Sequence, residues 1–184
     1  MHIAIEGLDG VGKTQTAKLL AEQYNLTFIQ KPLHYLTDTN GMENYLRMMK
    51  QINEAMDDDF KALYYGLGNI YLCRLANGIN VVTDRYLCST YFWNQTANNQ
   101  ILFDYLVRTA GLPDLTVILY ADAEVRRQRI LGRNANDPDL AEKVFPNNRY
   151  KKMIEFVQNY GANYVVVDNS EMDLNETVQE IAKI

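Results

Sequence analysis

The chain has few of the residues on which disulfide-bonded, metal-binding and membrane-spanning proteins depend. Its 184 residues include only two cysteines and two histidines. Cys73 and Cys88 form no CxxC pair, so we expect no disulfide framework, and His2 and His34 are expected to be structural or solvent-exposed. There is no run of about eighteen apolar residues, and the first apolar run begins almost at Met1, which leaves no room for a leader. The composition predicts a cytoplasmic protein without a membrane partner.

Excess positive charge is also missing. The 18 Lys and Arg against 23 Asp and Glu give a formal net charge of −5, which argues against bulk binding to nucleic acid. A hydrophobic content of 47% and a charged content of 22% are ordinary for a globular protein. This length and composition predict one domain over residues 1–184, and the expected partners are small molecules.

A phosphate-binding loop is present near the N-terminus. Residues 7–14 match the pattern G-x-x-x-x-G-K-[ST] without a mismatch. Glycines let backbone N–H groups approach phosphate oxygens, the lysine supplies a charge for the outer phosphates of ATP, and the threonine hydroxyl can hold Mg²⁺. The predicted ATP site therefore comprises Gly7, Leu8, Asp9, Gly10, Val11, Gly12, Lys13 and Thr14.

Short apolar strands alternate with helical patterns along the chain. The strands are expected at residues 2–5, 26–29, 80–83, 115–120 and 163–167, and one long helix is expected over residues 89–110. Such alternation predicts an α/β fold of the P-loop NTPase type, a five-stranded parallel sheet with helices on both faces in three layers. Polar, proline-containing residues 133–146 are predicted to form a lid.

Charged residues follow the third strand and the fourth. Asp84 and Arg85 end the third strand, where ligands bind in open α/β sheets. The acidic residues 57–59 are interpreted as the start of a helix rather than a metal site. Arg129 and Arg133 adjoin the predicted lid and are expected to act on the transferring phosphoryl group. Their neighbours Arg126 and Arg127 are interpreted as a solvated helix face.

These residues together resemble the bacterial-type thymidylate kinases, which are P-loop nucleoside monophosphate kinases. Residues 6–14 are similar to the family's E-G-x-[DE]-G-x-G-K-T, and residues 84–89 are similar to its D-R-[YH]-x-x-S. The stretch from Thr39 to Arg47, the P-D-L-T at 113–116, and Phe145 with Arg149 after the lid are weaker matches. Gly10 stands where some relatives carry an arginine, so the resemblance assigns the catalytic cation to the lid arginines.

The resemblance implies transfer of the ATP γ-phosphate to the 5′-phosphate of dTMP, giving dTDP, and a possible homodimer. Thr14 and Asp84 would organise Mg²⁺, Asp9 would accept a hydrogen bond from the acceptor sugar, and Arg47 and Arg85 would grip the acceptor phosphate. The implied catalytic residues are Lys13, Arg85, Arg129, Arg133 and Arg149. The implied acceptor-binding residues are Asp9, Arg47, Tyr64, Tyr65, Arg85 and Trp93, although core packing is an equal alternative for the three aromatic residues.

The base-binding end departs from the family pattern. Lys31 replaces the glutamate of the family's E-P-G-G, Gly68 or Asn69 stands where a base-binding arginine is expected, and residues 92–94 replace A-Y-Q. Without a matching hydrogen-bond partner, thymine recognition cannot be assigned to this site. A deoxynucleoside kinase and an ATP-binding regulatory module are the alternatives, and Lys31 counts against the first because that reaction needs a base. A GTPase is disfavoured because the chain has no N-K-x-D.

Overall fold

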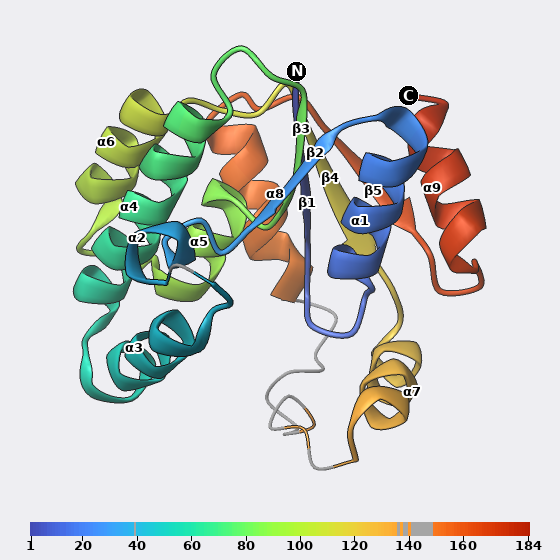
Figure 1. Cartoon of the computed structure of the whole chain (residues 1–184), viewed down its shortest axis with the longest axis horizontal. Coiled ribbons are helices and arrows are strands. Elements are labelled where there is room, and N and C mark those ends of the chain that lie inside the picture. Colours follow the sequence, from blue (N-terminus) through green and yellow to red (C-terminus); the bar gives the residue numbers. More distant parts are fainter. Residues whose placement is uncertain (39, 136, 138–139, 141–148) are drawn as a thin grey trace.

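The computed structural model describes residues 1–38, 40–135, 137, 140 and 149–184, and its centre is a parallel sheet (Figure 1). The strands are β1 (His2–Gly7), β2 (Thr27–Gln30), β3 (Val81–Asp84), β4 (Leu115–Tyr120) and β5 (Tyr164–Asp168). They lie in the order β2-β3-β1-β4-β5, and every paired neighbour is parallel. The predicted five-stranded parallel sheet is confirmed.

Helices cover both faces of this sheet. In Figure 1, α1 (Lys13–Tyr24) and α9 (Leu174–Ala182) lie on one side, and α5 (Leu87–Asn94) and α8 (Tyr150–Asn159) lie on the other. Helices α4 (Asp58–Leu75) and α6 (Gln100–Ala110) pack outside α5. The remaining helices are α2 (His34–Thr37), α3 (Glu43–Ala55) and α7 (Ala123–Arg133), and α7 lies beyond the carboxyl edge of the sheet (Figure 1).

The two central strands are apolar because both of their faces are covered. Ala4 and Ile5 in β1 and residues 117–119 in β4 are completely buried. A continuous apolar run is typical of a strand enclosed by helices on both sides. The core therefore fixes β1 rigidly, and the phosphate-binding loop leaves from the end of this fixed strand.

The acidic residues before α4 begin a helix, as expected. The side chain of Asp57 accepts a hydrogen bond from the backbone N–H of Phe60 at 2.8 Å, and Asp58 and Asp59 lie in the first turn. Negative charge at this end of a helix is stabilising. Among the described residues, no group of three His, Cys, Asp or Glu side chains could hold a metal ion.

The long helix predicted over residues 89–110 is wrong, because α5 and α6 are separate helices. The interruption is stabilised by Asn99, which is buried. Its side-chain oxygen accepts from the backbone N–H of Thr96 at 2.9 Å, and its Nδ2 donates to the carbonyl of Asn94 at 2.9 Å. Asparagine side chains compete in this way for the backbone groups that a continuous helix would use.

Two predictions, the lid and the lack of a membrane-spanning helix, involve segments that the structure describes only in part. The predicted lid, 133–146, falls mostly outside the described residues, as does Phe145. Within the residues that are described, no helix has the length and apolar character needed to cross a membrane.

Candidate active site

The phosphate-binding loop leaves β1 and ends at the first turn of α1. Gly7, Gly10 and Gly12 have φ angles of 140°, 86° and 93°. This part of backbone space strongly favours glycine. A Cβ on Gly10 would lie 2.6 Å from the carbonyl oxygen of Arg126, so the loop packs directly on the backbone of α7. The pattern read in the sequence thus has the strand–loop–helix context that phosphate binding requires.

Lys13 is buried at the end of this loop, with 6% of its surface exposed. Its Nζ donates to the carbonyl of Leu8 at 2.7 Å and lies 3.6 Å from Oδ1 of Asp9. Burial lowers the pKa of Lys13 to about 8, and the positive charge of Arg85 acts in the same direction. The ammonium group is therefore held against the loop by Leu8 and Asp9. The negative charges around it only partly offset the effect of burial on its pKa.

Thr14 and Asp84 come together across the neighbouring strands β1 and β3. Because Ile5 of β1 pairs with Asp84 of β3, the strand registers bring the end of β3 beside the loop. The hydroxyl of Thr14 donates a hydrogen bond to Oδ2 of Asp84. The other oxygen, Oδ1, is buried and has no hydrogen-bond partner within the described part of the chain. A buried carboxylate oxygen in this state is suited to a cation.

Asp9 lies between two cations. It forms an ion pair with Arg85, and Lys13 lies on it at 3.6 Å. Burial alone would raise the pKa of Asp9, but the charges of Arg85 and Lys13 outweigh burial and hold it below the ordinary value. One loop carboxylate thus contacts both the lysine expected at the donor phosphates and the arginine expected at the acceptor phosphate.

Glu6 is a residue of this site for which sequence reasoning gave no role. Its carboxylate is completely buried. Oε1 accepts from the backbone N–H groups of Tyr86 at 2.8 Å and Ser89 at 3.2 Å, and Oε2 accepts from the Ser89 hydroxyl. Burial raises the pKa of Glu6, and the Ser89 hydrogen bond and the charge of Arg85 partly offset that rise. The available signal was that Glu6 and Ser89 belong to the two strongest motif matches.

The interpretation of Arg126 as a solvated residue is wrong, whereas Arg127 is exposed as expected. Arg126 is completely buried, its Nε donates to the carbonyl of Ala121 at 3.1 Å, and its guanidinium lies 5.9 Å from the centre of the Tyr150 ring. A long side chain with an aromatic neighbour can bury its stem and head in this way. Arg126 instead joins α7 to the first turn of α8.

Arg129 is turned toward the loop after β5. Its guanidinium donates to the backbone carbonyl of Asn169 at 2.8 Å, to the Asn169 side chain at 3.1 Å and to the carbonyl of Met172 at 3.4 Å. The buried Asn169 in turn donates to the carbonyl of Val11 at 2.9 Å. Arg133, one turn further along α7, bonds to Asp137 at 2.6 Å. The catalytic roles of both arginines stay predictions.

Arg149 and Trp93 are brought together from helices far apart in sequence. Arg149 precedes the first residue of α8, and its guanidinium lies 4.9 Å from the Trp93 ring centre and 5.0 Å from that of Phe92. Trp93 is 41% exposed, so it does not have the complete burial of a core residue.

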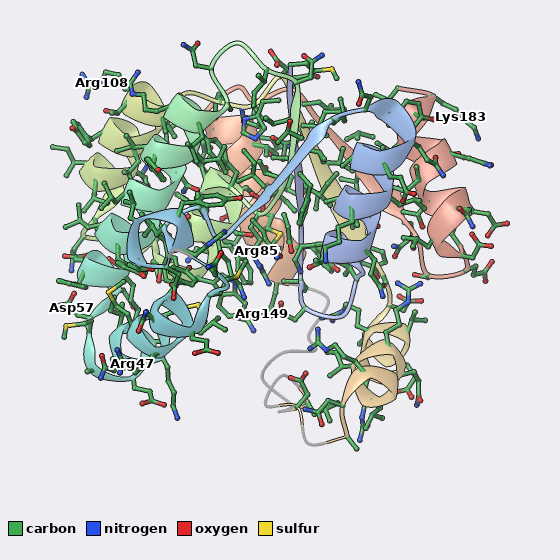
Figure 2. The ribbon with its side chains drawn as sticks, viewed as in Figure 1. Arg47, Asp57, Arg85, Arg108, Arg149 and Lys183 are labelled. Atoms are coloured by element: carbon green, nitrogen blue, oxygen red, sulfur yellow. The ribbon has the colours of Figure 1, made fainter. Side chains whose placement is uncertain are left out.

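Arg47 does not lie with the other cations. Its guanidinium donates to the side chain of Asn44 at 3.2 Å on α3, and Figure 2 shows it at the outer end of that helix, apart from Arg85. Arg47 lines a surface cavity of about 410 Å³ between α2 and α3, together with Thr37, Asn44, Met48 and Gln51. A role at the acceptor phosphate would require α3 to approach the sheet.

The two tyrosines of α4 form an edge-to-face pair with ring centres 5.2 Å apart. The Tyr65 hydroxyl donates to Asn53 at 2.7 Å. Burial raises the pKa of Tyr65, and the hydrogen bond to Asn53 and the positive charge of Arg85 partly offset the rise. Asn69, where the base arginine was expected, is buried and donates to the Thr90 hydroxyl at 2.8 Å. Its amide therefore links α4 to α5.

The structure thus gathers most of the predicted residues at the carboxyl edge of β1 and β3. Thr14 contacts Asp84, and Asp9 contacts both Lys13 and Arg85. A lysine beside backbone amides and an arginine sharing its counter-ion can hold two phosphate groups of separate molecules.

Comparison with known proteins agrees with this geometry. The family model for thymidylate kinase matches residues 5–181. The chain is similar to a thymidylate kinase of Staphylococcus epidermidis, with 30% identity over 91% of this chain and 84% of that protein. It is also similar to a probable thymidylate kinase of Methanocaldococcus jannaschii, with 26% identity over 98% of this chain and 93% of the relative.

Solved structures show the same fold. Thymidylate kinase from Ehrlichia chaffeensis has a TM-score of 0.66 and 20% identity, covering 100% of this chain and 97% of that one. A deoxyadenosine kinase from M. mycoides has a TM-score of 0.65 and 17% identity, with the same two coverages. At these identities the likeness establishes the P-loop kinase fold and no finer property. On the family match along nearly its whole length, the chain belongs to the thymidylate kinase family of phosphotransferases.

Proposed function

We propose that the protein transfers the γ-phosphoryl group of ATP to the 5′-phosphate of a deoxynucleoside monophosphate, with dTMP as the expected acceptor. The observation that carries this proposal is the position of Asp9, which contacts both Lys13 and Arg85. A protein that only bound ATP would have no use for a second phosphate-binding cation beside the loop. The family membership supports the same reaction.

The donor phosphates would bind to the backbone N–H groups of residues 7–14 and to Lys13. The first turn of α1 adds the positive end of its dipole. In the transfer, the bond between the γ-phosphorus and the bridging β-phosphate oxygen breaks. A new bond forms from an oxygen of the acceptor phosphate, and ADP leaves. The acceptor phosphate is already ionised near neutral pH, so no general base is needed.

The oxygens of Thr14 and Asp84 are of the kind that would hold Mg²⁺. The buried Oδ1 of Asp84 needs a positive partner, and the Thr14 hydroxyl is already turned to the same carboxylate. Mg²⁺ prefers few protein oxygens and completes its shell with phosphates and water. Bound there, it would neutralise charge on the donor phosphates. Thr14 and Asp84 would hold it and orient the loop.

The cations on the lid side would stabilise the charge that develops during transfer. Arg133 and Arg149 flank the predicted lid, 133–146, at its two ends. Arg129 would act from α7, where its guanidinium bonds to the loop after β5, and Arg85 would hold the acceptor phosphate. Arg47 would join the acceptor phosphate after α3 moves inward, as closure does in other kinases.

The acceptor base would lie near the side chains of Tyr64, Tyr65 and Trp93. The partial exposure of Trp93 supports this position. Because the amide of Asn69 already bonds to Thr90, the position of the family's base-binding arginine offers weak discrimination between bases. The acceptor range is therefore expected to be broader than dTMP alone.

A homodimer through α4 and α6 is part of the proposal, as is action in the cytoplasm. Both helices expose apolar side chains, with Leu67 at 53% and Ile101 at 78%. The first turn of α4 is acidic, and its last turn carries Arg74. In an antiparallel two-fold pairing, Asp58 of one copy would meet Arg74 of the other, so the same patch is complementary to itself. Leu67→Asp should lower the solution mass from dimer to monomer in light scattering.

The experiment that tests the reaction measures ATP consumption by the purified protein with Mg²⁺. Each deoxynucleoside, each deoxynucleoside monophosphate and no acceptor are tested in parallel. Consumption with dTMP confirms the proposal, and consumption with other monophosphates as well confirms the broad acceptor range. Consumption with unphosphorylated nucleosides only would replace it with a deoxynucleoside kinase. ATP binding without any consumption would indicate a binding module.

A further inference from the structure

The turn after β3 is held by a buried carboxylate from the neighbouring strand. Glu6 lies one residue beyond the pairing of Ile5 with Asp84, directly beside the turn. It receives the N–H of Tyr86, the N–H of Ser89 and the hydroxyl of Ser89. A buried charge is tolerated only where hydrogen bonds compensate it, and three donors converge here. These hydrogen bonds fix Tyr86 and Ser89, which follow Arg85 in the chain.

Arg85 needs such support because its backbone is unfavourable. Its φ of 72° lies in the left-handed region, which is costly for a residue with a side chain. Its N–H donates to the carbonyl of Ile5 at 3.0 Å, and the next N–H, that of Tyr86, is bound by Glu6. Strained backbone of this kind persists only where the surroundings over-determine it, and Glu6 provides that constraint from β1.

The arginine head is held by the same network. One guanidinium nitrogen of Arg85 donates to the Ser89 hydroxyl oxygen at 3.3 Å, and another donates to Asp9. A serine hydroxyl has one hydrogen. Because that hydrogen is given to Glu6, the lone pairs of the Ser89 oxygen remain available to accept from Arg85. Glu6 therefore sets the direction of the hydrogen bond that orients the arginine.

We propose that Glu6 is a positioning residue that acts through Ser89 on Arg85, and that it sets the affinity for the acceptor phosphate without touching it. The inference rests on the proposed function of Arg85 as the acceptor-phosphate cation. Glu6 belongs to β1 and Asp9 to the ATP loop, so the orientation of the acceptor cation is determined by the donor side of the site. A displacement of about 1 Å at such a cation can cost on the order of 100-fold in rate.

Glu6→Gln separates this role from simple packing. The glutamine oxygen can still accept from the two backbone N–H groups, but its Nε2 would donate to the Ser89 oxygen. The Ser89 hydrogen could then no longer point at residue 6 and would be turned toward the Arg85 guanidinium. Because that group is also a donor, the hydrogen bond between Arg85 and Ser89 would be lost. Ser89→Ala removes the intermediary and leaves the two backbone donors on Glu6. If one variant does not fold, the other still tests the inference.

The test measures KM for dTMP and for ATP, kcat and the free energy of unfolding for E6Q, S89A and the double variant. The solvent exchange rate of the Arg85 Nε–H is followed by ¹⁵N NMR. The matched control is Asn99→Ala, which removes three hydrogen bonds that join the α5–α6 connection to Thr96, to Asn94 and to Asp59 of α4. We expect each single variant to raise KM for dTMP by about tenfold, with KM for ATP within twofold. The double variant should be no worse than either single one, because both break one network.

Several results would overturn the inference. A purely structural role predicts that E6Q and S89A behave as Asn99→Ala does, with lower stability and unchanged preference between the two substrates. Unchanged Arg85 Nε–H exchange in both variants contradicts the positioning role even where stability falls. The exchange measurement needs no turnover. If the wild-type protein transferred to no monophosphate, the proposed function would fail while Nε–H exchange still decided whether Glu6 orients Arg85.

Discussion

The donor side and the acceptor side of this site are built by different means. On the donor side, Lys13 and Thr14 begin α1 directly after the loop, and Asp84 ends β3, which the sheet register places beside them. On the acceptor side, Arg47, Tyr65 and Trp93 come from three helices that depend on tertiary packing. The first group matches the strongest family motifs, whereas the second matches the family weakly at Arg47 and departs from it at residues 92–94. Phosphate binding is thus fixed by backbone geometry, whereas base recognition is free to vary with side chains on packed helices.

The largest effect is expected on the donor side, from Lys13→Ala. Removing a preorganised charge at the transferring group costs about 10²- to 10³-fold in kcat. Steady-state ATP consumption with saturating dTMP checks this expectation. Lys18→Ala is the matched control, because Lys18 is an exposed lysine of the same helix and contacts only the face of Phe28 at 5.7 Å among the interactions described for it. Equal activity of the two variants would remove Lys13 from the mechanism.

Gly10→Ala tests the contact between the loop and α7. The new Cβ would lie 2.6 Å from the carbonyl oxygen of Arg126, and its φ of 86° disfavours alanine. We expect a loss of about 2–3 kcal/mol in unfolding free energy, of which the left-handed backbone alone costs about 1–2 kcal/mol. ATP affinity should fall with it, since α7 must move. Chemical denaturation and calorimetric titration measure the two quantities.

Gly78→Ala is the comparison for this variant. Gly78 has a φ of 79° but open space around its Cβ, and it lies in the turn before β3, away from the loop. The Gly78→Ala variant should lose only the part of the unfolding free energy that the left-handed backbone costs. Its affinity for ATP should not change. A loss of affinity in both variants, or in neither, would contradict the role assigned to the contact with α7.

The pH dependence of ATP binding should report the buried Lys13. Its pKa of about 8 in the free protein lies below its ordinary value of 10.5. Donor phosphates favour the protonated amine, so binding above pH 8 requires proton uptake. The dissociation constant for ATP should therefore rise about tenfold per pH unit above 8 and stay flat below it, since a one-unit change in pH is worth 1.36 kcal/mol. ATP itself does not titrate there, because its last pKa is near 6.

Calorimetric titration in buffers of different ionisation enthalpy measures this proton uptake directly. In Lys13→Arg the cation stays charged throughout the range. The dissociation constant of that variant for ATP, whatever its absolute value, should be the same at pH 7 and at pH 9. A slope that persists in Lys13→Arg would assign the titration to another group.

The sequence was sufficient for the donor side because spacing determines its structure. The G-x-x-x-x-G-K-[ST] pattern at residues 7–14 predicts a phosphate-binding loop between a strand and a helix, and the strand register places Asp84 beside it. The sequence was not sufficient to predict whether a long side chain is exposed to solvent or packs against a partner. Arg126 was expected in solvent but is buried beside Tyr150, a residue 24 positions away. Periodicity cannot indicate such a partner.

The break between α5 and α6 is a different case, because the sequence carried a signal for it. Residues 94–100 are polar apart from Ala97, and Asn99 bonds there to Thr96 and Asn94. Glu6 belongs to a motif that the sequence shows. Its role depends on the positive φ of Arg85, which neither composition nor spacing can predict. Residue identity could therefore predict the charges at the site, whereas tertiary contacts decided how those charges are oriented.

The smallest effects are expected on the acceptor side, where Tyr64 and Tyr65 form a matched pair on α4. The Tyr64 hydroxyl is buried without a hydrogen-bond partner in the described part of the chain, whereas the Tyr65 hydroxyl bonds to Asn53 at 2.7 Å. Tyr64→Phe should raise the unfolding free energy by up to about 1 kcal/mol, and Tyr65→Phe should lower it by about 1 kcal/mol. Both variants keep their rings, so stacking on the acceptor base survives and KM for dTMP should change less than threefold. Denaturation and steady-state kinetics on the two variants separate these effects. A destabilised Tyr64→Phe with a raised KM for dTMP would show instead that its hydroxyl is a polar contact of the acceptor site, and base recognition would then reside in that hydroxyl.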